Sequence, residues 1–429
     1  MPSMRDRAFA SGVWWRFACR DSDYAGNNGD ARRTGTRNPG NPRNSRNPDN
    51  PVTPTTPTTP TTPTTPTTPA PSLTPAGVAD FTTLDLGVIA NYAAPVLPVY
   101  YDATVAAFDN TPTNNAINNR MATLGRVLFY DKRLSINDTI SCASCHIQAS
   151  GFSDPRRFSV GFAGALFTLA HSMRLGNVRF FQPGTMFWNK RATSVEDQAI
   201  QPIINSVEMG FVPAVGGITA AITKMQATTY YPDLFVFAFG DSTITETRMQ
   251  QALAQFVRSM ISFNSRWDTA YAQVFSPAAP NRALGVSLPG FTPQEDRGRH
   301  LFMLSVGAGG AGCASGHGPP TFALSANSQG IGLDAGETTV FKSPSLKNVG
   351  LPGAFMHDGR FTTLDAVVEH YNSGVQAGPA LDARLRGPGG VPLQLNLSAA
   401  DKAALVAFMH TLTDTVLTTD LKFSDPFKK

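Results

Sequence analysis

The run Cys142-Ala-Ser-Cys145-His146 constrains this 429-residue chain more than any other feature. Two thiols at this spacing can each form a thioether with one vinyl group of a haem, and the histidine that follows directly can ligate the iron. A zinc site would need a second ligand pair at similar spacing, which the sequence lacks. A thioredoxin-like disulfide would follow a strand in a βαβ pattern, whereas polar loop residues precede Cys142. The motif therefore predicts covalently bound haem c and redox chemistry.

A second, altered copy of this motif stands downstream as Cys313-Ala-Ser-Gly316-His317. It repeats the first copy letter for letter, except that Gly316 replaces the second cysteine. Taken alone, one cysteine and one histidine in a glycine-rich loop are more often an inert thiol and a surface imidazole. Taken as an echo of the first motif, they predict a second haem that is held by one thioether to Cys313 and ligated by His317.

The N-terminal part of the chain differs in composition from the rest. Residues 1–79 are rich in Asn, Arg, Gly, Pro and Thr, with a Thr-Thr-Pro repeat from Thr55 to Pro69. Such a repeat cannot bury a core, and its prolines favour an extended polyproline II spacer. We therefore expect residues 1–79 to form a disordered segment rather than a domain.

The same segment also carries the net charge of the chain. It holds nine arginines and five aspartates up to Ala70, which accounts for the whole formal net charge of +4. The remainder is balanced, so nucleic-acid binding has no support from charge. No apolar stretch reaches the roughly 18 residues that a membrane-spanning helix needs, so none is predicted.

The first 19 residues make an export signal difficult to identify. Covalent haem attachment by the usual bacterial machinery takes place outside the cytoplasmic membrane, which predicts a periplasmic or otherwise exported protein. However, Arg16 interrupts the short apolar run after Arg7, and Arg16-Phe-Ala-Cys19 is a poor lipoprotein cleavage site. Either translation starts elsewhere or export is unconventional. Cys19 is interpreted as incidental, with a lipid anchor as the alternative.

The body of the chain shows helical rather than strand-like patterns. Thr243-Ile-Thr-Glu246 has capping-box spacing, and Ser398 to Asp401 similarly opens a second helix. The apolar residues that follow at intervals of three and four are Met249, Leu253, Phe256, Val257, Met260 and Ile261 in the first helix, and Leu405, Phe408, Met409 and Leu412 in the second. Strand-like alternation is scarce. The pattern predicts a mainly α fold in which long loops carry the haem motifs, as in cytochrome c-like domains.

With these motifs in place, the chain from about Asn91 to Asp414 resembles the bacterial dihaem cytochrome c peroxidase family, including its MauG-type methylamine-utilisation relatives. The matching segments, in family order, are Leu124-Gly-Arg-Val-Leu-Phe-Tyr-Asp131, the first haem motif, Phe187-Trp188-Asn-Lys-Arg-Ala192, Val195-Glu-Asp-Gln198, Val207-Glu208-Met209-Gly210, the altered second motif, Phe341-Lys-Ser-Pro-Ser-Leu-Lys-Asn348 and Met356-His-Asp-Gly-Arg360. Several motifs in this order make the resemblance specific. It implies a peroxidatic haem c domain over residues 80–285 and an electron-transfer haem c domain over residues 286–429.

The resemblance also implies roles for residues around the first haem. His146 is the expected proximal ligand, opposite an open position where peroxide reacts. Glu208 matches the family's catalytic glutamate, a general acid and base that moves a proton between the two peroxide oxygens. Gln198 matches the glutamine that accompanies it. Without the motif, a single glutamate is best interpreted as a solvated surface charge.

Between the two haems, Trp188 matches the family position where an indole relays electrons, although a large core side chain is a compatible interpretation. His171 falls near the region of the distal side and of an interhaem calcium ion, and a hydrogen-bonded core histidine explains it equally well. Calcium between the domains is a further possibility that the resemblance raises.

The second haem is the expected electron-entry site, usually closed by a second protein ligand. Peroxidases of the family use a methionine there, and MauG-type members use a tyrosine. Tyr371, in a predicted helix from Thr363 to Asn372, falls at the ligand position, and Met356 is the competing candidate. A thioether raises the iron potential whereas a phenolate lowers it, so the choice bears on function.

Three departures from the family pattern stand out. Gly316 removes one of two thioethers and puts covalent loading of the second haem in question. Asn189 and Lys190 replace residues that are usually acidic, or acidic and glycine, and Ser343 stands where threonine is common. The last two changes are mild.

These observations predict an exported dihaem c-type peroxidase that reduces hydrogen peroxide to water with electrons from a small cytochrome c or cupredoxin. One alternative is a MauG-like enzyme that oxidises a partner protein, which Tyr371 favours. Another is a non-catalytic electron-transfer cytochrome. A homodimer is compatible with the sequence.

Overall fold

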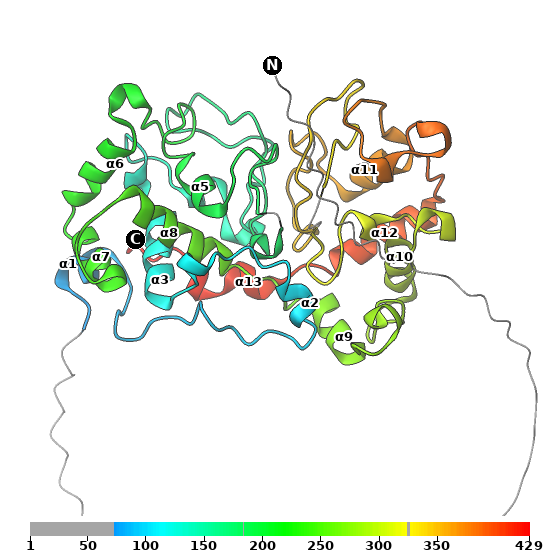
Figure 1. Cartoon of the computed structure of the whole chain (residues 1–429), viewed down its shortest axis with the longest axis horizontal. Coiled ribbons are helices and arrows are strands. Elements are labelled where there is room, and N and C mark those ends of the chain that lie inside the picture. Colours follow the sequence, from blue (N-terminus) through cyan, green and yellow to red (C-terminus); the bar gives the residue numbers. More distant parts are fainter. Residues whose placement is uncertain (1–72, 183, 324–326) are drawn as a thin grey trace, which may run out of the picture. The chain divides into compact units, whose positions relative to one another are not determined.

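A computed structural model describes residues 73–182, 184–323 and 327–429 of the chain. The α-helices are α1 (Ala76–Phe81), α2 (Ala103–Ala106), α3 (Asn119–Tyr130), α4 (Cys142–Cys145), α5 (Val195–Ile200), α6 (Gly217–Gln226), α7 (Tyr231–Phe239), α8 (Glu246–Arg258), α9 (Arg266–Val274), α10 (Pro293–Met303), α11 (Leu364–Glu369), α12 (Ala399–His410) and α13 (Thr415–Thr419) (Figure 1). Pairing between extended segments is limited, in these residues, to isolated bridges. The predicted mainly α fold is confirmed. The Thr-Thr-Pro segment and Cys19 lie outside the described residues. The predicted disordered segment, residues 1–79, extends too far, because residues 76–79 lie in α1 and Val78 is fully buried.

Local capping decides where the two predicted helices begin. Ser398 caps α12 as expected, because its hydroxyl accepts a hydrogen bond from the Asp401 backbone N–H at 3.1 Å. The predicted start of α8 was wrong: the cap is Thr245, whose hydroxyl accepts from the Arg248 N–H at 3.2 Å. Thr243 instead donates its N–H to Asp241 at 2.9 Å. The competing aspartate two residues earlier makes a turn at Thr243 and delays the helix.

Two hydrophobic cores organise the described residues. The first core contains residues of α3 and α8, and the second core contains residues of α10 and α12. In each core one glycine lets the helix pair approach closely. A Cβ on Gly125 of α3 would lie 2.0 Å from the Ala252 carbonyl oxygen of α8, and one on Gly298 of α10 would lie 1.8 Å from that of Ala404 in α12. No side chain fits at either crossing.

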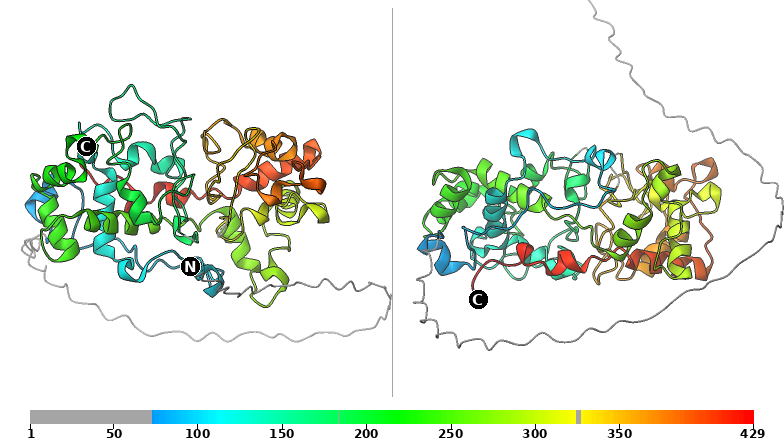
Figure 2. Two further views of the ribbon diagram at one scale, coloured as in Figure 1. Left: turned by 45° about the horizontal axis from the view of Figure 1, so that its top comes forward. Right: turned by 90° about the horizontal axis from the view of Figure 1, so that it is seen from below.

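The chain passes between the cores near both of its ends. Tyr100 is fully buried in the second core, although it precedes α3 in sequence. Conversely, Phe423 belongs to the first core, and its carbonyl accepts a hydrogen bond from the Tyr130 hydroxyl at 2.6 Å. Figure 2 shows the C-terminal segment running back along the helices of the first core. The predicted domain division at residues 285 and 286 stays a prediction.

Equivalent contacts recur in the two parts of the chain. Asn177 and Asn348 both have a φ of 64°. The side-chain oxygen of Asn177 accepts the Ser262 N–H at 2.8 Å, and that of Asn348 accepts the Asp414 N–H at 2.7 Å. Ser262 and Asp414 are therefore equivalent positions, and they bond directly to each other, hydroxyl to carboxylate, at 2.9 Å. In two units that are related by a two-fold axis, equivalent residues meet at that axis, so this contact indicates a local two-fold relation.

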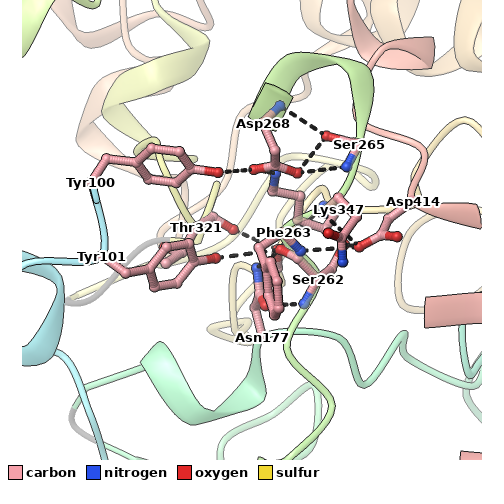
Figure 3. A network of polar contacts seen from close by, with 12 residues as sticks. Tyr100, Tyr101, Asn177, Ser262, Phe263, Ser265, Asp268, Thr321, Lys347 and Asp414 are labelled. Atoms are coloured by element: carbon pink, nitrogen blue, oxygen red, sulfur yellow. Dashed lines mark hydrogen bonds and ion pairs between the residues drawn. The ribbon is translucent and has the colours of Figure 1, made fainter. Parts of the chain in front are cut away.

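A buried polar network surrounds this meeting point (Figure 3). Lys347 and Asp268 form an ion pair of 2.5 Å, and their side chains are 0% and 1% exposed. The Tyr100 hydroxyl donates to the same carboxylate at 2.7 Å, which ties the segment before α3 to α9. Asp414 accepts two backbone N–H groups from the segment that follows α8, at 3.0 Å each. The network thus joins segments that are far apart in sequence.

Candidate haem sites

The first motif folds into the single turn α4, which brings its two cysteines together. Ser141 precedes the turn, and its N–H donates to the Ser144 hydroxyl at 3.0 Å. Cys142 and Cys145 are free thiols. Burial raises the pKa of Cys142 to about 12 and that of Cys145 to about 11, so both remain protonated at neutral pH.

His146 follows this turn with its ring fixed in one orientation. Its Nδ1 lies 2.9 Å from the Phe152 carbonyl oxygen and 3.1 Å from the Ser172 hydroxyl. A carbonyl only accepts, so Nδ1 carries the proton and Nε2 keeps the lone pair that a metal requires. Burial lowers the pKa of His146 and thus favours this neutral form. The two thiols and this imidazole form a donor set that fits haem c.

The second motif repeats this arrangement despite Gly316. Cys313 lies in the short 3-10 turn Cys313–Ser315. His317 Nδ1 lies 3.1 Å from the Pro344 carbonyl oxygen and 3.2 Å from the Ser343 hydroxyl. Burial lowers the pKa of His317 to about 4, so the ring is neutral.

The supporting serines are equivalent as well. Ser172 donates to the carbonyl of Cys145 at 2.6 Å, and Ser343 donates to that of Gly316 at 2.8 Å. The serine therefore supports the same position of the motif in both copies. Ser343 performs this hydroxyl role in place of the family's common threonine.

A cavity of about 510 Å³ opens beside the second motif. Its lining includes Cys313, His317, Met356, Tyr371, Trp188 and His171. Apolar side chains of α11, α12 and residues 393–397 form much of the remaining wall. A cavity of this size, with a thiol and a neutral imidazole in its wall, fits a large, mostly apolar cofactor such as haem.

Both candidates for the second axial ligand line this cavity. The predicted helix around Tyr371 is present as α11, which continues into the π-helix His370–Gly374. Burial raises the pKa of Tyr371, and the nearby Cys313 raises it further. Met356 adopts a φ of 70°, in the turn that Phe355 and Phe361 close by a backbone bridge.

Trp188 lies where the two parts of the chain exchange backbone hydrogen bonds. The Lys342 N–H donates to the Trp188 carbonyl at 2.7 Å, and the His171 N–H donates to the His357 carbonyl at 2.8 Å. The Trp188 indole N–H donates to the His171 carbonyl at 2.7 Å. The indole is therefore held in place in the wall of the cavity beside the second motif.

His171 is a buried and hydrogen-bonded histidine. Its Nδ1 lies 3.1 Å from the Arg157 carbonyl oxygen, and its Nε2 lies 3.3 Å from the Ser153 hydroxyl. Burial lowers its pKa. Both ring nitrogens have partners, which agrees with the interpretation of a core histidine.

Glu208 is brought close to the first motif by the loop after α5. Its charge raises the pKa of both Cys142 and Cys145, so the carboxyl group lies within electrostatic reach of the two thiols. Burial raises the pKa of Glu208 itself, and the Arg191 guanidinium opposes this shift. The loop is held because the Glu208 N–H donates to the Asn205 side chain at 3.1 Å. Gln198 lies near the end of α5 in the same part of the chain.

Three cations around these sites were not predicted from the sequence to have a role. The guanidinium carbon of Arg191 lies 3.4 Å from the centre of the Phe187 ring, and the charge of Arg191 lowers the pKa of Glu208. Lys342 and Arg174 line the cavity beside the second motif. Lys342 lies in the segment from Phe341 to Asn348 that resembles the family, and this resemblance could have identified it as a candidate site residue. Arg174 has no local pattern, because only the folded chain places it there.

Within residues 73–182, 184–323 and 327–429, each helix is too short or too polar to cross a bilayer. In the same residues, no group of three or more His, Cys, Asp or Glu side chains is arranged to hold a metal ion.

Known proteins match this chain over most of the described residues. A family model, Di-haem cytochrome c peroxidase, matches residues 119–274. The methylamine utilization protein MauG of Methylorubrum extorquens is 30% identical over 319 residues, which cover 70% of this chain and 80% of that protein. Cytochrome c551 peroxidase of Nitrosomonas europaea is 27% identical over 320 residues, covering 69% and 80% of the two chains. The crystal structure of a MauG-like protein associated with microbial copper homeostasis superimposes with a TM-score of 0.62 at 28% identity, covering 78% and 99%.

Proposed function

Because the chain belongs to the dihaem cytochrome c peroxidase and MauG family, we propose that it reduces hydrogen peroxide to water with electrons from a small redox protein. The predicted family is confirmed, and the chain is a cytochrome c peroxidase-type oxidoreductase that uses haem c. The observation that carries the specific proposal is the half-buried Glu208, whose charge contributes to the raised pKa of the Cys142 and Cys145 thiols. A carboxyl group there can serve peroxide chemistry.

In this proposal, Cys142, Cys145 and His146 hold the first haem, and Cys313 and His317 hold the second. Haem iron supplies electron exchange and a binding position for a peroxide oxygen. The Phe152 carbonyl accepts the His146 Nδ1 proton at 2.9 Å, which keeps the imidazole neutral and oriented. The Pro344 carbonyl does the same for His317 at 3.1 Å.

Glu208 is the proposed general base and acid. It takes the proton from the inner peroxide oxygen and returns it to the outer one, so that the departing oxygen leaves as water. Its raised pKa, caused by burial, brings it nearer to the pKa of an effective proton shuttle at neutral pH. Arg191 limits the rise and keeps the group able to ionise. Gln198 is proposed to orient peroxide through its amide.

Trp188 is the proposed electron route between the two haem sites. Its indole is held by the His171 carbonyl at 2.7 Å, and its own carbonyl by the Lys342 N–H at 2.7 Å. A fixed aromatic ring in the wall of the cavity beside the second motif is suited to electron transfer. The donor is proposed to be a small cytochrome c or cupredoxin that delivers electrons to the second haem.

Oxidation of a partner protein is the second candidate function. It is supported by Tyr371, which lines the cavity beside the second motif. MauG-type members use a tyrosine as the second axial ligand. A phenolate ligand lowers the iron potential, whereas a thioether ligand such as Met356 would raise it. Two further proposals complete this function. The protein acts in the periplasm, because covalent haem attachment takes place outside the cytoplasmic membrane. A calcium ion lies between the haem sites, as the resemblance to the family implies.

Electron paramagnetic resonance of the purified protein, combined with peroxide consumption, tests the proposal. We expect two haems, one of them high-spin in the active form, and peroxide consumption that accelerates when a reduced small cytochrome is added. Two haems that stay low-spin under all conditions, without peroxide consumption, would instead identify an electron carrier. Peroxide consumption that no small donor accelerates would favour the partner-protein alternative.

A further inference from the structure

The cavity beside the second motif has an uneven distribution of charge. Part of its wall is apolar and comes from Leu364 and Val368 of α11 and from Leu405 and Met409 of α12. Another part comes from residues 171–174, 341–345 and 354–357, and this part carries cations. A ligand that fills the cavity must therefore be apolar over one region and anionic over another.

Lys342 is a buried cation without a carboxylate partner among the described residues. Its side chain is 4% exposed, and its ammonium lies 3.9 Å from the centre of the Phe181 ring. The described ion pairs do not include it. Burial, together with the nearby charge of Lys190, lowers its pKa to about 7. Nothing in this part of the protein compensates its charge.

Arg174 is a second cation without a carboxylate partner among the described residues, and its side chain is half-buried. Its Nη2 donates to the Leu351 carbonyl at 3.1 Å, and its guanidinium lies 5.6 Å from the centre of the Phe355 ring. Its buried Nε has no hydrogen-bond partner in the described chain. Burial lowers its pKa to about 10, with no acidic group acting against this shift.

The other arginine that lines the cavity is paired, which sets it apart from these two cations. Arg384 binds Asp382, which lines the cavity as well, at 2.5 Å. Buried charges are normally paired, since an uncompensated one is strongly disfavoured. Lys342 and Arg174 thus provide two binding positions for negative charge, at a cavity that already holds a thiol and an imidazole for haem.

We propose that Lys342 and Arg174 bind the two propionate carboxylates of the second haem. This inference rests on the proposed function, because it requires a haem at Cys313 and His317. Haem carries its two carboxylates along one edge and is apolar over the rest, which matches the division of the cavity wall. Two carboxylates also neutralise two cations. Because Gly316 leaves a single thioether, these ionic contacts contribute more to holding this haem than they would at a doubly tethered site.

The pairing has a measurable consequence for reduction of the second haem. A propionate that loses its cation is a negative charge near the iron, which favours the oxidised state, so the potential becomes more negative. The freed propionate also has a higher pKa, so its protonation becomes coupled to reduction and the potential begins to vary with pH.

The experiment uses the haem-loaded protein and four variants. Lys342→Met and Arg174→Met remove one cation each, and Lys342→Arg keeps the charge. Lys402→Met is the matched control, because Lys402 already binds Glu369 at 2.5 Å, is 32% exposed and does not line the cavity. Spectroelectrochemical titration gives the potential of the second haem at several pH values, and resonance Raman spectra report the propionate bending modes.

We expect both methionine variants to shift the propionate bands and to make the second potential more negative and pH-dependent. Lys342→Arg should restore the pH-independent potential, and Lys402→Met should match the unmodified protein. Unchanged potentials and Raman bands in both methionine variants, with an intact first-haem spectrum, would overturn the inference. Mass spectrometry separates it from the function: absence of a second haem refutes both, whereas shifted bands in a protein without peroxide turnover support this inference alone.

Discussion

At the scale of single residues, Glu208 is the proposed proton carrier, and its replacement gives the most direct test. Glu208→Gln keeps the shape of the side chain but removes the transferable proton. We expect peroxide turnover to fall about a hundredfold or more, since general acid and base catalysis contributes roughly 10²–10⁴-fold. Haem content and spectra should remain unchanged. Near-normal turnover of this variant, measured by steady-state peroxide consumption, would refute the role of Glu208.

The pH profile of turnover gives an independent measure of the same residue. Glu208 must be deprotonated to accept a proton, so turnover falls as pH drops through its pKa. Because burial raises that pKa above the usual value of a glutamate, this acidic limb should lie at higher pH than for a solvent-exposed carboxyl group. Arg191→Met should move the limb to still higher pH, since Arg191 holds the pKa down. A limb that stays in place in Arg191→Met would contradict this electrostatic account.

Trp188 offers a second test at this scale. Trp188→Phe retains an aromatic ring but loses the indole N–H that binds the His171 carbonyl at 2.7 Å. If the indole couples the haem sites, both haem spectra should be preserved while electron transfer from the second haem to the first slows after peroxide is added. Rapid-mixing absorption spectroscopy measures this rate. An unchanged rate would assign Trp188 to packing alone.

At the scale of structural elements, the position directly after the Cys313–Ser315 turn has room for a side chain in place of Gly316. A Cβ added to Gly316 would meet no atom closer than 3.7 Å, and the φ of −102° suits any residue. We expect the unmodified protein to contain a second haem with one free vinyl group and therefore an α-band at longer wavelength. Gly316→Cys should give two similar haems. Mass spectrometry after acid-acetone extraction checks the tethering, and equal α-bands in the unmodified protein would contradict it.

The crossing of α10 and α12 supplies a prediction about stability. Gly298→Ala places a methyl group against the Ala404 carbonyl, so the helices must separate. Overpacking of a core costs roughly 1–3 kcal/mol, and we expect a loss of unfolding free energy of at least about 2 kcal/mol. Gly285→Ala is the control, because a Cβ there meets nothing within 4 Å. Urea unfolding measures both, and equal stability of the two variants would show that the crossing tolerates a side chain.

At the scale of the whole molecule, the buried pair of Lys347 and Asp268 ties distant segments together. Lys347→Met leaves the Asp268 carboxylate buried without its cation, and removal of one partner from a buried pair costs about 3–5 kcal/mol. Arg297→Met is the control, because Arg297 is half exposed where it binds Asp401, and such pairs contribute at most about 1 kcal/mol. Chemical unfolding should separate the two variants clearly. Similar losses would mean that solvent reaches the Lys347 pair.

At this scale, only part of the structure could be predicted from the sequence. Spacing in the haem motifs, the stripe of α8 and the Ser398 cap are local signals, and a mainly α family member follows from them. The placement of Tyr100 in the second core, the return of Phe423 to the first core and the unpaired Arg174 depend on contacts between distant segments. No periodicity encodes such contacts. The predicted cap of α8 was wrong for a different reason, because the Asp241 carboxylate accepts a hydrogen bond from the Thr243 N–H and this local bond competes with the helix.

The direct bond between Ser262 and Asp414 has a consequence for the ancestry of the chain. The two residues occupy equivalent positions on the local two-fold relation, so in a dimer of identical units each would face its own copy. Two aspartates in contact would repel, and two serines would leave the backbone N–H groups of residues 263 and 264 without the carboxylate that now accepts them. Fusion of two units into one gene removes this constraint. Each half can then carry the residue that the other half needs, and a fused chain can likewise confine a difference such as that between Cys145 and Gly316 to one of its two sites.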